Sequence, residues 1–189
     1  MRRYYHLYGK DFKGMHFAVK DKDFNELNFF KNIKGKTKIP FGYTLKDFHN
    51  NIIKKDPIWL DYLPSSKVWP FMSEKLKNII DERLTGKEKI VWMTAKVKGP
   101  DEVKVYYVPR FEKRLDVLDT KKTKFDEEGD FLVPFFSLSK IQSYSMFSPK
   151  DKFWQITSYL IVTEEIKKAI VKEKLTGISF EEVTGRVTK

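Results

Sequence analysis

The sequence contains no cysteine. A disulfide framework, a cysteine-ligated zinc site and a thiol nucleophile are therefore excluded. The only histidines are His6, His16 and His49, and none is followed two to four residues later by another metal ligand. Only 9 glycines are present, and the sequence has neither a Gly-x-Ser-x-Gly motif nor a glycine-rich phosphate loop. We expect no catalytic, cofactor-binding or metal-binding residues, and no enzymatic activity.

Long apolar runs are also missing. No stretch approaches the ~20 apolar residues that a membrane-spanning helix needs. Arg2 and Arg3 stand near the start, but no apolar segment of the kind found in export signals follows them. We therefore expect a cytoplasmic protein with no membrane partner.

Aromatic residues, in contrast, are abundant. The 189 residues include 16 Phe, 9 Tyr and 4 Trp. Large rings bury much apolar area each, so a well-packed core is expected and a disordered chain is not. The length suits one α+β domain over residues 1–189, with room for a small N-terminal subdomain over residues 1–56.

The positive charge is concentrated in the first part of the chain. The net charge is +11; residues 1–56 hold 13 Lys/Arg and 6 Asp/Glu, whereas residues 101–189 hold 16 and 15. Only 6 of the 37 basic residues are Arg, the residue that best grips phosphates and base edges. A lysine-rich excess favours a solvated surface or diffuse attraction to an acidic partner.

Two helices can be read directly from the sequence. Ser73 is a candidate N-cap, apolar residues follow at helical spacing to residue 84, and Gly86 is a stop signal. Residues 163–175 repeat this pattern, with Thr163 as the candidate N-cap and Gly177 as the stop. A third helix around residues 45–53 is a weaker expectation.

The remaining apolar segments predict β-structure. Residues 4–8 predict a short strand with residues 14–19 as its hairpin partner, and the proline-punctuated residues 57–71 predict an extended segment on the core. Val103, Val105 and Tyr107 alternate with polar or aromatic neighbours, which indicates a half-buried strand after a turn at residues 99–100. Further strands are expected at residues 90–97, around 115–117, 131–138, 153–162 and 178–180. The fold class is therefore α+β, a mostly antiparallel sheet with two or three packed helices.

Two acidic motifs resemble functional sites superficially. Asp116 and Asp119 stand three residues apart, but such a pair more often caps a strand and the turn after it. Residues 126–130 (DEEGD) lack the alternating ligand spacing of a calcium loop, so a solvated hairpin tip is expected.

Five segments occur in a characteristic order. They are LDYLP (60–64), WPFMSEKL (69–76), Tyr106-Tyr107 with Arg110, Asp116 and Asp119, TEEIKKAI (163–170) and LTGISFEEV (175–183). Taken together, they resemble a bacterial family, the immunity proteins of polymorphic toxin systems, long catalogued as a domain of unknown function. The resemblance covers roughly residues 57–183, and the opening RYY at residues 3–5 fits it too. One departure is that Lys121, Lys122 and Thr123 stand where the family often has Ser shortly after its Asp-x-x-Asp.

The resemblance implies an α+β fold and a non-enzymatic task, the neutralisation of a cognate protein toxin. Because the chain is basic, we expect the toxin to present an acidic face, or to be bound away from a basic active site. The alternative is a nucleic-acid-binding module that uses the basic N-terminal half. Its best motifs are Arg2-Arg3-Tyr4-Tyr5 and Tyr106-Tyr107 with Arg110 and Arg114, although no recognised nucleic-acid-binding motif is present. The sequence does not determine the toxin, the surface that binds it or the oligomeric state.

Overall fold

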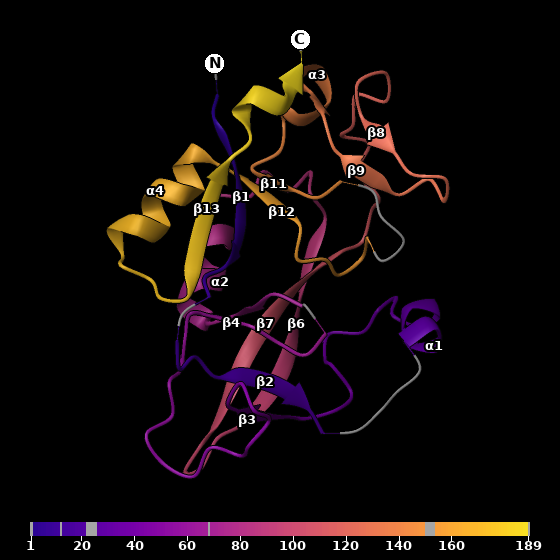
Figure 1. The fold of residues 1–189 in the computed structure, drawn as a ribbon. Coiled ribbons are helices and arrows are strands. Elements are labelled where there is room, and N and C mark those ends of the chain that lie inside the picture. Colours follow the sequence, from indigo (N-terminus) through magenta and orange to yellow (C-terminus); the bar gives the residue numbers. More distant parts are fainter. Residues whose placement is uncertain (1, 12, 22–25, 68, 150–153, 189) are drawn as a thin grey trace.

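The computed structural model describes residues 2–11, 13–21, 26–67, 69–149 and 154–188. These residues form an α+β fold with two main sheets, which confirms the expected class (Figure 1). The upper half of Figure 1 holds a four-stranded sheet and the lower half a six-stranded one. Strand pairing is mostly antiparallel, and the two parallel ladders join β3 to β6 and β10 to β14.

The four-stranded sheet joins the beginning of the chain to its last third. Its order is β11-β12-β1-β13, with β1 at Tyr4–Gly9, β11 at Met146–Phe147, β12 at Leu160–Thr163 and β13 at Ile178–Glu182. The strand expected at residues 4–8 is confirmed, but its predicted hairpin with residues 14–19 is wrong. β1 pairs instead with β12 and β13, and Phe17–Lys20 forms β2 in the other sheet.

The six-stranded sheet is built around one long hairpin. β6 (Ile90–Lys98) and β7 (Val103–Phe111) pair along their whole length, which confirms the strands expected at residues 90–97 and 103–107 with a turn between them. The order is β2-β3-β6-β7-β5-β4, with β3 at Tyr43–Lys46, β4 at Tyr62–Leu63 and β5 at Phe71–Met72. A bridge between Ala18 and Ser65 brings the two edges together, so the sheet curls like part of a barrel.

Four helices accompany the sheets. The two longer ones, α2 (Glu74–Asp81) and α4 (Glu164–Lys172), are those that the sequence predicts, and they contact each other through the Lys75–Glu173 ion pair of 3.1 Å. α1 (Glu26–Lys31) and α3 (Leu138–Ile141) are short. The helix expected around residues 45–53 is wrong: Leu45 and Lys46 belong to β3, and a turn held by Asp47 follows, with Asn50 at a φ of 64°.

Residues 112–137 form fewer strands than expected. The strand predicted around residues 115–117 is wrong, because this segment forms no ladder and only Leu118 bridges to Phe136. Pro134 divides the strand expected at residues 131–138 into β9 (Phe131–Val133) and β10 (Phe136–Ser137). β8 (Lys124–Phe125) pairs with β9 around the expected acidic tip, β14 (Val187–Thr188) pairs with β10, and a 3-10 turn covers Thr184–Arg186.

Buried apolar side chains form two clusters. One lies between the four-stranded sheet and the helices α2 and α4, and the other fills the inside of the curled sheet. β7 contributes to both, because Phe111 packs in the first cluster while Tyr106 and Val108 pack in the second. In Figure 1, β6 and β7 accordingly run from the upper half of the molecule into the lower half.

Candidate partner-binding surface

The segments that resemble the immunity proteins meet at Asp61. Its carboxylate accepts hydrogen bonds from the Thr176 amide (2.8 Å) and hydroxyl (2.9 Å), and from the Ser73 hydroxyl (2.7 Å). Ser73 caps α2 by accepting a bond of 3.2 Å from the Leu76 amide. The shared residues thus hold α2, the end of α4 and the extended segment together, which is a structural role.

Two of the histidines have structural partners. His6 stacks on Tyr159 with ring centroids 4.3 Å apart, and burial lowers its pKa. His16 accepts a hydrogen bond of 2.9 Å from the Ile58 amide through Nδ1, and burial lowers its pKa as well. Across the described ranges, no group of three His, Asp or Glu residues is placed to hold a metal ion.

The acidic motifs make contacts within the fold. Asp119 accepts a bond of 2.7 Å from the Thr188 hydroxyl, which is the main reason that its pKa lies below the ordinary value, whereas Asp116 pairs with Lys140 at 2.9 Å. Asp126 accepts bonds from the Glu128 and Asp130 amides and so shapes the tip between β8 and β9.

The basic–aromatic motifs do not form an exposed stacking platform. Tyr4, Tyr5 and Tyr106 are buried in the two clusters. Arg110 is only 3% exposed and donates to Glu112 at 2.9 Å. Bases cannot stack on rings that are already packed in a core, which leaves half-buried Tyr107, with Lys77 5.6 Å from its ring centre, as the one partly exposed ring in these motifs.

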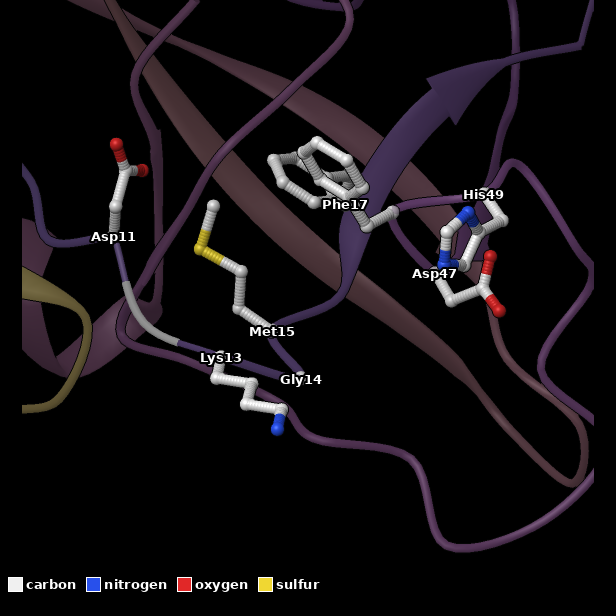
Figure 2. A pocket seen from close by; sticks show the side chains of 8 residues that line it. Asp11, Lys13, Gly14, Met15, Phe17, Asp47 and His49 are labelled. Atoms are coloured by element: carbon white, nitrogen blue, oxygen red, sulfur yellow. The ribbon is translucent and has the colours of Figure 1, made fainter.

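A mostly apolar pocket of about 870 Å³ opens beside β2. Figure 2 shows Met15 and Phe17 between Asp11 on one flank and Asp47 and His49 on the other. Phe48 also lines the pocket and is 80% exposed, the largest exposed fraction among the large apolar side chains described. Asp47 is held by the Asn51 side chain and amide, and these bonds lower its pKa.

One side of the curled sheet faces away from its core. Buried residues on all four strands face inward, so their neighbours in sequence face outward. Strand register aligns Val19, Thr44, Lys98 and Val103 in one row across β2, β3, β6 and β7. We call this side the outer face; its members are Phe17, Val19, Thr44, Lys46, Lys96, Lys98, Val103 and Val105.

The outer face carries the apolar side of β7. Val103 is 57% exposed and Val105 is 44% exposed, whereas Tyr106 is buried and Lys104, on the same side as Tyr106, is partly exposed. Lys104 lies 4.9 Å from the centre of the Trp59 ring and pairs with Glu102 at 3.3 Å. Alternation alone would favour burial of the valine side. The strand itself is confirmed, but nothing in the sequence indicates that its valines face solvent.

A hollow of about 480 Å³ adjoins the outer face next to Val105. Its lining also includes Lys38, Phe41, Gly42, Thr94 and Lys96. The Ile39 amide donates a backbone hydrogen bond of 2.9 Å to the Thr94 carbonyl between two of these lining segments. Phe17 and Phe48 lie at the opposite corner, with ring centroids 6.4 Å apart. The surface thus combines apolar anchors with a concave site, as protein interfaces do, and adds lysines, which attract an acidic partner.

In the part of the chain that the structure describes, no helix is long and apolar enough to cross a membrane. No curated protein matches this chain. Among known protein families, the Immunity protein family (Imm11) matches residues 11–185, which extends the resemblance across nearly all of the N-terminal part. The chain therefore belongs to the immunity protein family Imm11.

Proposed function

We propose that this protein binds a cognate bacterial toxin and neutralises it by non-covalent contact, in the cytoplasm and without catalysing a reaction. The observation that carries the proposal is the family match over residues 11–185. The outer face supports it, because exposed valines on regular strands and a nearby hollow suit protein binding.

Protection of living cells tests this function directly. We expect the gene beside that of this chain to encode a large protein with a toxic C-terminal domain. Cells that express this domain should survive when they also make the full chain, and the purified pair should form a complex in calorimetry. The control is a toxin domain from an unrelated system, which should kill equally with or without the chain. Cell death despite abundant folded chain would refute the proposal.

Nucleic-acid binding by the N-terminal half is the second candidate. It is favoured by the 13 Lys/Arg against 6 Asp/Glu in residues 1–56. The burial of Tyr4 and Tyr5 counts against it, because the aromatic rings of the N-terminal motif are packed in the core and cannot stack on bases. A labelled single-stranded oligonucleotide should show no mobility shift even at low salt. A shift that weakens steeply as salt rises would favour this candidate instead.

A further inference from the structure

The outer face leaves apolar side chains exposed on a regular strand. β7 pairs with β6 along its whole length, so Val103 and Val105 lie in a continuous ladder, although β5 meets β7 only at Tyr107, beyond the two valines. In antiparallel sheets with one solvated face, that face normally carries polar residues. Here the solvated side of β7 instead carries Val103 and Val105, which are 57% and 44% exposed. Exposed apolar side chains on a regular strand depart from this rule, and such departures are expected at functional sites.

The lysines beside these valines have no acidic partner of their own. Lys98 lies opposite Val103 and Lys96 opposite Val105 in the β6–β7 ladder. Together with Lys38 and Lys46, they make no ion pair with any residue that the structure describes. Two acidic groups close by are already engaged, since Glu102 pairs with Lys104, and Asp21 accepts a bond of 2.6 Å from Thr44, which leaves Asp101 in the β6–β7 turn as a single acid beside four lysines. The face is therefore apolar and positively charged at once.

Size and shape also fit a protein partner. The four strands from β2 to β7 span three inter-strand spacings, ~14 Å, and the pocket beside Phe48 and the hollow beside Val105 extend the surface at opposite corners. Side chains that fill such hollows contribute most of the binding energy in typical interfaces, which bury about 800 Å² on each partner.

We propose that the toxin docks on this outer face and presents there an acidic surface with an apolar side chain that enters the hollow between Lys38, Lys96 and Val105. This inference rests on the proposed function and adds to it the surface and the chemistry of the partner. Unpaired lysines attract carboxylates over a distance of about a Debye length, while the valines and the hollow exclude water once contact is made.

Charge reversal tests the electrostatic half of the proposal. The double variant Lys96→Glu, Lys98→Glu is compared with Lys121→Glu, Lys172→Glu, which changes the net charge equally at exposed residues outside this sheet. Calorimetry with the toxin domain should show binding at least about 100-fold weaker for the first variant and within about twofold of wild type for the second. Wild-type association should also slow as salt rises, and this salt dependence should shrink in K96E/K98E.

Two valines of nearly equal exposure test the apolar half. Val103 on the outer face is 57% exposed and Val171 on α4 is 58% exposed. Val103→Thr should weaken toxin binding about tenfold, because a hydroxyl enters a dry contact, whereas Val171→Thr should leave binding unchanged. Far-UV circular dichroism on each variant separates loss of binding from loss of fold.

The outcomes distinguish this inference from the function beneath it. If the wild-type chain neither protects cells nor binds the toxin domain, the proposed function fails. If the wild type binds, but K96E/K98E and V103T, correctly folded, bind as tightly as their controls, the toxin docks elsewhere and the inference is overturned. It is equally overturned if K96E/K98E abolishes only oligonucleotide binding or only self-association in gel filtration while toxin binding persists.

Discussion

Gly86 and Gly177 follow the two longer helices with the same left-handed backbone, at φ values of 78° and 74°. Their surroundings differ. A Cβ at Gly86 would meet no atom within 4 Å, whereas one at Gly177 would lie 2.5 Å from the Tyr62 carbonyl oxygen and 2.9 Å from the Leu60 Cβ. A backbone oxygen cannot swing aside as the end of a side chain can. Gly177 is therefore needed for its lack of a side chain as well as for its conformation.

We expect Gly177→Ala to lower the free energy of unfolding by about 3 kcal/mol, because it adds a steric clash to backbone strain. Gly86→Ala should cost only about 1 kcal/mol, the strain of a left-handed alanine. Urea unfolding of both variants measures the difference. Equal losses of unfolding free energy would show that residues 60–62 shift to accommodate the added methyl group without cost.

Glu88 is a fully buried carboxylate with a complete set of donors. It accepts bonds from the Ser145 amide (2.7 Å), the Thr85 hydroxyl (2.7 Å) and the Thr85 amide (3.0 Å). Burial alone would raise its pKa, but these hydrogen bonds outweigh burial and hold the pKa below its ordinary value. The charged form of Glu88 thus ties the loop after α2 to the segment before β11.

A depressed pKa stabilises the fold at neutral pH, and this contribution disappears in acid, as the pH falls below the ordinary pKa of a glutamate and through the lower folded-state pKa. Glu88→Gln should therefore unfold more easily at pH 7, by about 1–3 kcal/mol, since its amide cannot accept from three donors. The difference in unfolding free energy between Glu88→Gln and the wild type should become smaller at acid pH. Thermal unfolding from pH 7 to pH 3 measures it, with Glu128→Gln at the exposed hairpin tip as the control. A deficit that does not change with pH would contradict a charged Glu88.

At the level of elements, Ser73 and Thr163 look alike in the sequence but act differently. Both precede a helix with extended backbone, yet only the Ser73 hydroxyl caps its helix, while it also donates to Asp61. Thr163 is buried, and within the described ranges its hydroxyl has no hydrogen-bond partner. The sequence indicates where a helix begins, but not which cap is made.

Ser73→Ala should cost about 2 kcal/mol of unfolding free energy, because it removes the cap and the bond to Asp61 together. Thr163→Val keeps the shape and removes only an unsatisfied hydroxyl, so it should be neutral within about 0.5 kcal/mol or stabilising. Chemical denaturation of the two single variants measures both changes in unfolding free energy. A loss above about 1 kcal/mol for Thr163→Val would mean that its hydroxyl does make a bond.

The elements predicted correctly depend on neighbours in sequence. The two longer helices have capping residues, periodic apolar residues and a closing glycine, and the β6–β7 hairpin has a two-sided pattern around Gly99. Other outcomes depend on distant partners. Phe17–Lys20 pairs with β3 and not with β1, and the valine side of β7 faces outward because the inner side is filled by Tyr106 and Val108. No local pattern encodes which face a curled sheet closes around. For the same reason, the outer face could not be located from the sequence.

Across the whole molecule, the two apolar clusters share their strands. Phe71 packs in one cluster and its neighbour Met72 in the other, and β7 crosses both. Residues 1–56 also divide between the sheets, because β1 pairs with β12 and β13 while β2 and β3 join the curled sheet. We therefore propose that residues 1–189 unfold as a single domain, without a separate N-terminal subdomain.

The expected result is one cooperative transition in urea. Circular dichroism at 222 nm reports mainly on α2 and α4, which pack on the first cluster. In a Trp92→Phe, Trp154→Phe variant, fluorescence comes from Trp59 and Trp69, which belong to the second cluster. The two signals should change at the same urea concentration. Separate midpoints would show that the clusters are independent.

The position of β1 has a consequence for synthesis. β1 lies between β12 and β13, so both strands that flank it are made at least 150 residues later. At a translation rate of about 5–20 residues per second, β1 waits on the order of ten seconds with both of its edges open. Loop closure over such a separation is also slow. A newly made chain can therefore complete this sheet, and bind a partner, only after β13 has been synthesised. Binding-competent protein appears later than its messenger RNA by at least the time needed to translate the chain as far as β13.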